Sequence, residues 1–275
     1  MIDNGNPCGY DEKNAMKEGE GMKQRGKLRW ILMAICLVCL VVSGIWLGRY
    51  WLQSRRTMEN VAELKKLVQE AEAQAPEEEG SGLLRLAEEN SDLAGWIRVP
   101  GTAVDYPVML PPADAPEYYL RRNFQREYDI NGIPFLDARC TVDPCSDNLI
   151  IYGHNMYSGV MFHDLLSYRK EDFWREHPVV EFETLTDTGR YEVIGAFLYD
   201  ASSGADAFKP HASVDFADEE TFDAYMEEVR SAAYYDTGVQ PVYGRQILTL
   251  VTCDRSVLSN GRLVIVTQEM PEDGV

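Results

Sequence analysis

The longest stretch of the chain without a charged side chain is residues 30–48, and almost all of its residues are apolar. A helix rises 1.5 Å per residue, so these ~19 residues reach roughly across the hydrocarbon core of a bilayer. A stretch that is apolar on every side does not fit a half-buried helix of a soluble domain. It is also longer than the apolar region of a typical secretory signal peptide, and no small-residue cleavage site closes it. We therefore predict a retained signal-anchor, a single membrane-spanning helix over residues 29–50.

The residues before this helix, 1–28, are polar and show no apolar periodicity, which is typical of a loosely ordered tail. Basic residues flank the helix on both sides, with a slight excess on the N-terminal side, and such a bias favours a cytoplasmic N-terminus. The basic residues before the helix are Lys23, Arg25, Lys27 and Arg29, and those after it are Arg49, Arg55 and Arg56.

The residues after the helix, 51–82, consist of a segment with helical periodicity followed by a segment rich in helix-breaking residues. Val61, Leu64 and Val68 recur at helical spacing among charged residues, which predicts an amphipathic juxtamembrane helix or stalk up to residue 75. The sequence PEEEGSG at 76–82 predicts a linker that lets the following domain swing.

From residue 83 onward the pattern changes to short apolar and β-branched runs separated by turn residues, which predicts a mainly β domain over residues 83–275. A short helix is expected at 83–93, and further helices at 159–168 and 218–230. Residues 186–189 form a good hairpin turn. Strands are expected at 96–99, 104–109, 132–136, 148–152, 179–185, 191–199, 247–252 and 263–266.

Candidate chemistry lies at the ends of three of these strands. Cys253 directly follows the run 247–252, and Arg262 opens the next run after a short polar loop. Two strands joined by such a loop hold a thiol and a guanidinium close together. A fixed positive charge favours the reactive thiolate, and a guanidinium also suits an oxyanion. His154, at the end of another strand, is a candidate general acid and base.

The flanks of these residues resemble the sortases, the membrane-anchored cysteine transpeptidases of Gram-positive bacteria. TLVTC followed by a loop and GR, with YGHN upstream, carries the resemblance. It extends from about residue 83 to the C-terminus and implies a closed, mainly antiparallel β-barrel with peripheral helices, in which the helix at 218–230 helps to wall the substrate groove. Four further segments are similar to class B in detail: GWIRVPGTAVDYPVM (95–109), EYYLRRNF (117–124), GIPFLD (132–137) and GHNMYSGVMF (153–162).

The resemblance implies a role for each matching residue. Cys253 matches the nucleophile, His154 the general acid and base, and Arg262 the arginine that binds the oxyanion and positions substrate. Thr252 matches the threonine before the nucleophile, and Leu120 lies where class B enzymes line the peptide groove. Class B often carries a small polar residue between Leu250 and Thr252; this chain has valine there.

The implied reaction is cleavage of a C-terminal sorting motif after threonine through a thioacyl-enzyme. The surface protein is then transferred to an amine of a peptidoglycan precursor or a pilin. The resemblance places the catalytic domain outside the cell, anchored in the cell membrane, and requires no metal or organic cofactor.

The net charge of the chain excludes one class of partner. The 275 residues carry a formal net charge of −19, which argues against nucleic acid as a partner because phosphate binding needs a basic surface.

The other cysteines suggest no metal site. Cys140 and Cys145 flank a short loop with no second cysteine or histidine pair nearby, which argues against zinc and leaves a disulfide or free thiols open. The remaining cysteines lie in the tail (Cys8) and in the membrane helix (Cys36, Cys39).

Two other classes of function stay open on the sequence alone. A cysteine endopeptidase that passes the acyl group to water would use the same residues. A papain-like enzyme is disfavoured because its cysteine precedes its histidine, whereas here His154 comes first. A membrane-tethered binding domain without activity is the third possibility, and the presence of Cys253, His154 and Arg262 argues against it.

Overall fold

The chain divides into two compact units, Met1–Leu52 and Gln53–Val275. The computed structural model describes residues 12–74, 81–204, 207–254, 256 and 258–271. Helix α1 (Glu12–Gln74) runs through the first unit and continues into the second. Within the described residues it is the one helix long and apolar enough to cross a membrane, with a mean hydropathy of 2.6 in its most apolar window. The apolar helix expected near the N-terminus is thus present, whereas most of the predicted linker at 76–82 lies outside the described residues.

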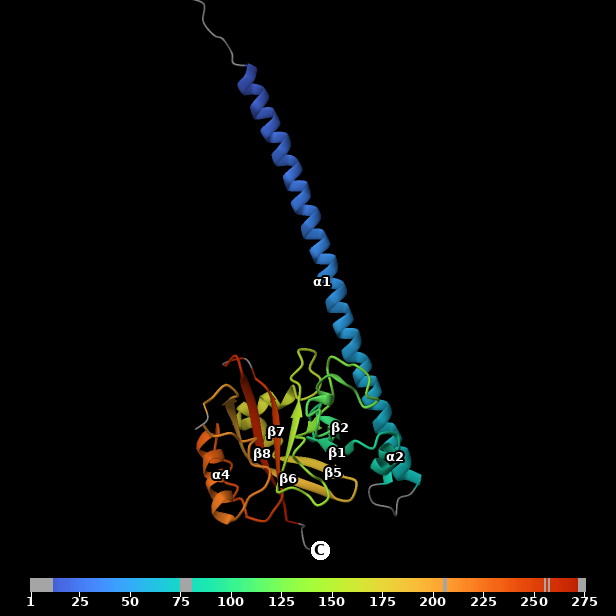
Figure 1. Ribbon diagram of the computed structural model, residues 1–275, viewed down its shortest axis with the longest axis vertical. Coiled ribbons are helices and arrows are strands. Elements are labelled where there is room, and N and C mark those ends of the chain that lie inside the picture. The colour runs from blue at the N-terminus through green and yellow to red at the C-terminus, as the bar shows by residue number, and fades with distance from the viewer. Residues whose placement is uncertain (1–11, 75–80, 205–206, 255, 257, 272–275) are drawn as a thin grey trace, which may run out of the picture. The chain divides into compact units, whose positions relative to one another are not determined.

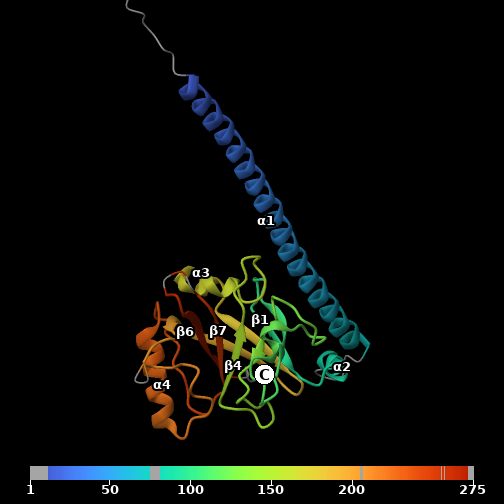
Figure 2. The ribbon, with the colours of Figure 1, turned by 45° about the horizontal axis from the view of Figure 1, so that its top comes forward.

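The second unit is a closed eight-stranded barrel (Figures 1 and 2), with the strands in the order β1-β2-β3-β4-β7-β8-β6-β5. All pairs are antiparallel except β2 with β3 and β4 with β7, so the expectation of a mainly antiparallel barrel is confirmed. The strands are β1 (Leu93–Arg98), β2 (Asp105–Met109), β3 (Phe135–Leu136), β4 (Asn148–Gly153), β5 (Val179–Thr184), β6 (Thr188–Asp200), β7 (Ile247–Cys253) and β8 (Gly261–Glu269).

Short helices surround the barrel: α2 (Ser81–Glu89), the 3₁₀ helices η1 (Tyr118–Arg121) and η2 (Asp164–Arg169), α3 (Glu171–Glu176) and α4 (Glu219–Ala232). Asp218 caps α4 by accepting a hydrogen bond from the Thr221 amide. The first turn carries two glutamates, whose negative charge interacts favourably with the positive end of the helix dipole. The buried face of α4 packs on β6.

Three details differ from the sequence-based expectations. The hairpin turn expected at 186–189 lies two residues earlier, because the Thr184 amide donates to the Asp187 carbonyl at 2.7 Å and Thr188 and Gly189 already pair with β5. The helix expected at 159–168 is wrong for its first half: Gly159 and Met161 have φ values of +82° and +61°, and the Met161 amide donates to the Tyr106 hydroxyl at 3.0 Å. These left-handed residues interrupt the helical pattern, and regular structure begins only at Asp164. The role implied for 218–230 is not seen either, because among the described residues that line the groove around Cys253 none belongs to α4.

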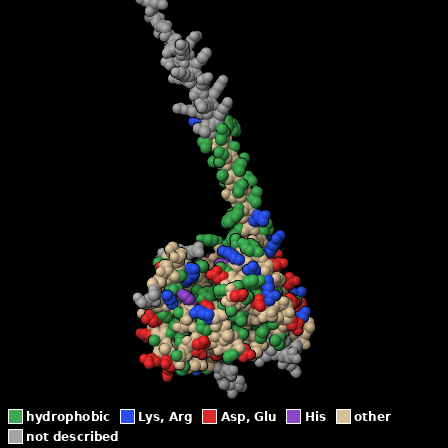
Figure 3. All heavy atoms as spheres, in the orientation of Figure 1, with side chains coloured by type: hydrophobic (Ala, Val, Ile, Leu, Met, Phe, Trp, Pro, Cys, Tyr) green, Lys and Arg blue, Asp and Glu red, His purple; other side chains and the backbone are tan. Residues whose placement is uncertain are grey.

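The part of α1 beyond Gln53 belongs to the hydrophobic core of the barrel unit. Leu64 is 3% exposed and packs in one cluster with Leu83 and Leu86 of α2, Trp96 of β1 and Ile133. Each such aliphatic side chain contributes about 1.5–3 kcal/mol when it leaves water. Figure 3 shows the contrast between the units: hydrophobic side chains surround α1 in the first, whereas acidic and basic side chains are interspersed over the second.

Candidate active site

The sheet register brings the three candidate catalytic residues to one end of the barrel. β4 and β7 are parallel, with Gly153 opposite Thr252, so the residues that follow β4 and end β7 meet at the same edge. β7 and β8 are antiparallel, with Cys253 opposite Arg262. The Thr252 hydroxyl donates to the Gly153 carbonyl at 2.8 Å and fixes this register.

A groove of about 470 Å³ opens at this edge. It contains all five residues that the sequence singled out, so the structure brings them together; their individual roles remain predictions. The groove is lined by Pro116, Glu117, Leu120, Arg121, Phe135, Asp137, Ala138, Tyr152, Gly153, His154, Val251, Thr252, Cys253 and Arg262.

The ring of His154 is held by the backbone of η1. Its Nε2 lies 2.8 Å from the Leu120 carbonyl oxygen. A carbonyl can only accept, so Nε2 carries a proton and the ring orientation is set by this bond. Leu120 therefore contributes its main chain to the site as well as the apolar side chain expected from the sequence.

Cys253 and Arg262 are both partly exposed at the ends of their strands. The Arg262 Nη1 donates to the Gly261 carbonyl at 3.0 Å, which ties the guanidinium to the first residue of its own strand. Cys253 is thus accessible from the groove, with a fixed cation on the neighbouring strand.

Asp137, which lines the groove, is paired with Arg139. Arg139 binds Asp137 in bidentate fashion, with both N–O distances at 2.8 Å, and the Tyr152 hydroxyl donates to the same carboxylate at 2.9 Å. Burial alone would raise the pKa of the Asp137 carboxyl, but these hydrogen bonds outweigh burial and hold that pKa below its ordinary value. Asp137 is therefore ionised at neutral pH, and Arg139 balances its charge.

The sequence did not single out Asn155, which links the segment after His154 to the nucleophile strand. Its Nδ2 donates to the Cys253 carbonyl at 3.0 Å, and its Oδ1 lies 2.8 Å from His163 Nδ1. Since the Cys253 carbonyl only accepts, the amide nitrogen faces it, and His163 must donate to the amide oxygen. His163, which the sequence assigned to a helix interior, is the N-cap residue of η2.

A buried carboxylate directly follows the nucleophile. Asp254 is 1% exposed, and its Oδ1 accepts from the amide and hydroxyl of Ser256 at 3.1 and 2.7 Å. Its Oδ2 lies 3.3 Å from Arg169 Nε, an ion pair without hydrogen-bond geometry. Arg169 also donates to the Ser256 hydroxyl at 2.7 Å. Arg169 therefore balances the charge of this buried carboxylate beside the nucleophile in the sequence.

The two loop cysteines are both free, which decides the question that the sequence left open. Cys140 is buried, and its thiol donates to the Asn148 carbonyl. Burial raises the pKa of the Cys140 thiol to about 11, so this thiol is protonated and unreactive at neutral pH. Cys145 is exposed.

The Asn155 contacts give a first prediction. Asn155→Ala should lower kcat about tenfold, equivalent to ~1.4 kcal/mol, because the segment carrying His154 loses its tie to the Cys253 carbonyl. Asn155→Asp keeps the acceptor for His163 but sets a carboxylate oxygen against that carbonyl, so it should be slower than the alanine variant. Steady-state kinetics, with thermal unfolding as the folding control, measures both. An aspartate variant as active as the unmodified chain would mean that the contact with Cys253 is dispensable.

Comparisons with known proteins agree with this architecture. A family model described as "Sortase domain" matches residues 97–270. Sortase B of Listeria monocytogenes is 31% identical over 236 residues, which cover 82% of this chain and 92% of that protein. The solved Staphylococcus aureus sortase B–substrate complex superposes with a TM-score of 0.71 at 24% identity, covering 80% of this chain and 98% of the other. The structure of sortase B from Listeria monocytogenes superposes with a TM-score of 0.58 at 30% identity, covering 68% of this chain and 99% of the other.

The closed barrel with its short peripheral helices is the sortase fold. The chain belongs to the sortase family, whose members are transpeptidases, and the relatives that it matches are class B sortases.

Proposed function

We propose that this protein is a membrane-anchored cysteine transpeptidase that attaches surface proteins to an amine acceptor of the cell envelope. The observation that carries the proposal is the meeting of three strand ends, which puts a thiol, an imidazole and a guanidinium in one groove. These are the parts that thiol acyl transfer needs: a nucleophile, a proton carrier and a cation for the oxyanion.

In the first half of the reaction, the Cys253 thiolate attacks the carbonyl carbon of the threonine in the sorting motif. Negative charge develops on the carbonyl oxygen, where the Arg262 guanidinium stabilises it. As the C–N bond breaks, His154 gives a proton to the leaving amine. The products are a thioacyl-enzyme and the released C-terminal peptide.

In the second half, an acceptor amine attacks the thioester carbonyl. His154 takes the proton from the attacking nitrogen, the C–S bond breaks, and Cys253 leaves as thiolate. Both halves use the same three residues, so the cycle closes with the enzyme unchanged. Wall peptide and pilin amines are both suitable acceptors chemically.

A panel of sorting peptides, incubated with the full chain in detergent and read by mass spectrometry, tests this function. With an oligoglycine or lysine amine present, ligated product should form, and without it only slow hydrolysis. Equal hydrolysis in both cases would favour the cysteine endopeptidase. An absence of any product, together with no labelling of Cys253 by a thiol-reactive substrate mimic, would favour a binding domain.

We also propose that the N-terminus is cytoplasmic and the barrel extracellular, on the slight excess of basic residues before the membrane helix. Two cysteines report the two sides. Exposed Cys145 should react with an impermeant maleimide on intact cells, whereas Cys8 in the tail should react only after permeabilisation. Peptide mapping reads both sites, and the reverse pattern would invert the topology.

A further inference from the structure

The helix that continues from the membrane span meets the barrel through buried polar groups as well as apolar ones. Ser54 and Thr57 of α1 are 3% and 4% exposed. Opposite them, Asp129 and Asn131 are 5% and 0% exposed. A helix face that packs on a core is normally apolar, and buried polar groups cost free energy unless they are hydrogen-bonded. The four buried polar side chains therefore need hydrogen-bond partners at this contact between the helix and the barrel.

These four residues form one connected network. The Thr57 hydroxyl donates to Asp129 Oδ2 at 2.6 Å and accepts from Asn131 Nδ2 at 2.8 Å. Asn131 also donates to Asp129 Oδ1 twice, through its backbone amide at 2.9 Å and through its side-chain Nδ2 at 3.1 Å. Ser54 Oγ lies 3.3 Å from Asn131 Oδ1. The helix thus fixes the conformation of the turn that contains Asp129 and Asn131.

That turn lies directly against the carbonyl that holds His154. Gly132 has φ +59°, and a Cβ on it would come within 2.5 Å of the Leu120 carbonyl oxygen. The next residue, Ile133, donates its amide to the Tyr119 carbonyl at 3.3 Å. Since the Leu120 carbonyl accepts from His154 Nε2, a shift of the turn displaces the acceptor that orients the imidazole.

A second contact reaches the segment that follows His154 in the chain. Ser54 Oγ lies 2.9 Å from the hydroxyl of Ser158, in the loop that follows the histidine. The Phe162 amide closes this loop by donating to the His154 carbonyl at 2.8 Å. The same helix face therefore touches both segments that hold the histidine.

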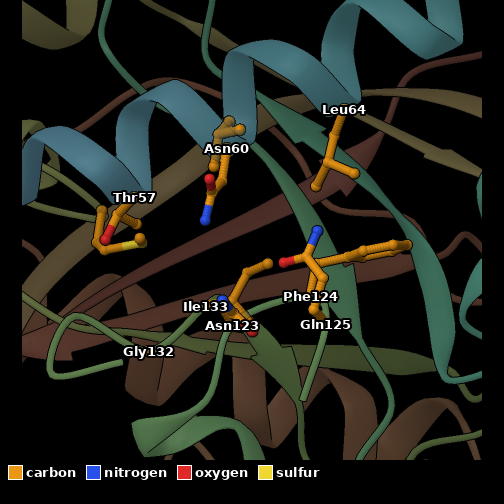
Figure 4. Close-up of a pocket in the computed structure, with 10 residues that line it drawn as sticks. Thr57, Asn60, Leu64, Asn123, Phe124, Gln125, Gly132 and Ile133 are labelled. Atoms are coloured by element: carbon orange, nitrogen blue, oxygen red, sulfur yellow. The ribbon is translucent and has the colours of Figure 1, made fainter. Parts of the chain in front are cut away.

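The helix is seated closely on these segments. Figure 4 shows side chains of α1 directed toward the loop residues across a narrow gap. The void between them is about 10 Å³, at the lower limit for one water molecule, so little space remains to absorb a displacement. The residues labelled there are Thr57, Asn60 and Leu64 of the helix, and Asn123, Phe124, Gln125, Gly132 and Ile133 of the loops.

We infer that Thr57 and Asn131 are positioning residues for His154. The juxtamembrane part of α1 would then set the position of the imidazole in the active site. The inference rests on the proposed function, in which His154 exchanges protons with the substrate. The path runs from Thr57 through Asn131 and the Gly132 turn to the Leu120 carbonyl and the imidazole. Misplacing a reacting group by about 1 Å can cost on the order of 10²-fold in rate, so a partial loosening should still be measurable.

The test is Thr57→Val in the full-length chain, which removes the hydroxyl at nearly constant volume. We expect kcat to fall about tenfold, with KM for the sorting peptide changed less than about twofold, because Thr57 is not among the residues that line the groove. Thr57→Ser restores the hydroxyl and should recover most of kcat. The matched control is Thr267→Val on β8, which removes another buried hydroxyl, one that bonds the Leu248 carbonyl at 2.8 Å. It should lower the thermal unfolding midpoint without lowering kcat.

A second readout does not depend on turnover. The chain has four histidines, so NMR spectra of histidine-labelled protein can resolve His154. Its imidazole signals should move in Thr57→Val and stay in place in Thr267→Val. Unmoved signals, or kcat loss that merely follows the folded fraction in both variants, would overturn the inference. If the unmodified chain ligates no peptide, the proposed function fails, while the imidazole signals still decide the positioning role.

Discussion

Replacing Cys253 with alanine should abolish thioacyl formation and lower turnover by on the order of 10⁴-fold or more, the scale on which removal of a covalent nucleophile acts. The physical reason is that no other described thiol lies in the groove. The fold should survive, because Cys253 is partly exposed at the end of β7 and its carbonyl, which Asn155 binds, belongs to the main chain. Peptide cleavage followed by mass spectrometry measures the effect, with thermal unfolding alongside.

Cys145→Ser is the matched control for this variant. Cys145 is an exposed free thiol outside the groove, so its replacement should leave turnover unchanged. Cleavage retained by Cys253→Ala would show that another group attacks the substrate and would remove the basis of the proposed mechanism.

Replacing Arg262 with lysine should lower kcat roughly 10²-fold or more, the cost of removing an oxyanion donor. Arginine could act by charge alone, by favouring the thiolate, or by presenting donors at fixed positions to the substrate oxygen. Lysine keeps the charge and loses the planar fork. We favour geometry, because donors aimed at the carbonyl oxygen stabilise charge that exists only in the transition state.

Alkylation of Cys253 by a small reagent separates the two roles of Arg262. The pH dependence of this alkylation should change little in Arg262→Lys, since the local positive charge remains, while transpeptidation falls. Near-normal transpeptidation by the lysine variant would show that Arg262 acts through its charge alone and not through the position of its donors.

Much of the barrel could be predicted from local pattern. The strands that carry the site, β4, β7 and β8, are continuous apolar runs bounded by polar loops, and their ends fell within a few residues of the expected positions. Burial on both faces makes such runs easy to recognise. Because chemistry-bearing residues follow the ends of these runs, the composition of the groove could also be anticipated.

What could not be predicted depends on contacts between distant parts of the chain. The apolar spacing at 159–168 indicates a helix, but the Tyr106 hydroxyl, far away in the sequence, binds the Met161 amide and holds that residue at positive φ. The Leu120 contact with His154 uses a main-chain carbonyl, which every residue possesses, so the side-chain sequence carries no sign of it.

The polar face of α1 is a similar case. Ser54 and Thr57 precede an apolar stripe, and polar residues at such positions commonly face solvent. Only the tertiary structure shows that they are buried against Asp129 and Asn131. Asn155 was missed for the same reason, since its two partners become neighbours only when β4 and β7 pair.

The most direct test of the account is to trap the acyl-enzyme. The full chain is mixed with a sorting peptide, quenched in acid, digested and mapped by mass spectrometry. The account predicts that the peptide containing Cys253 gains the mass of the N-terminal acyl fragment, and that this adduct disappears when an acceptor amine is added, with ligated product in its place. An adduct on another residue, or cleavage with no adduct at Cys253, would contradict it.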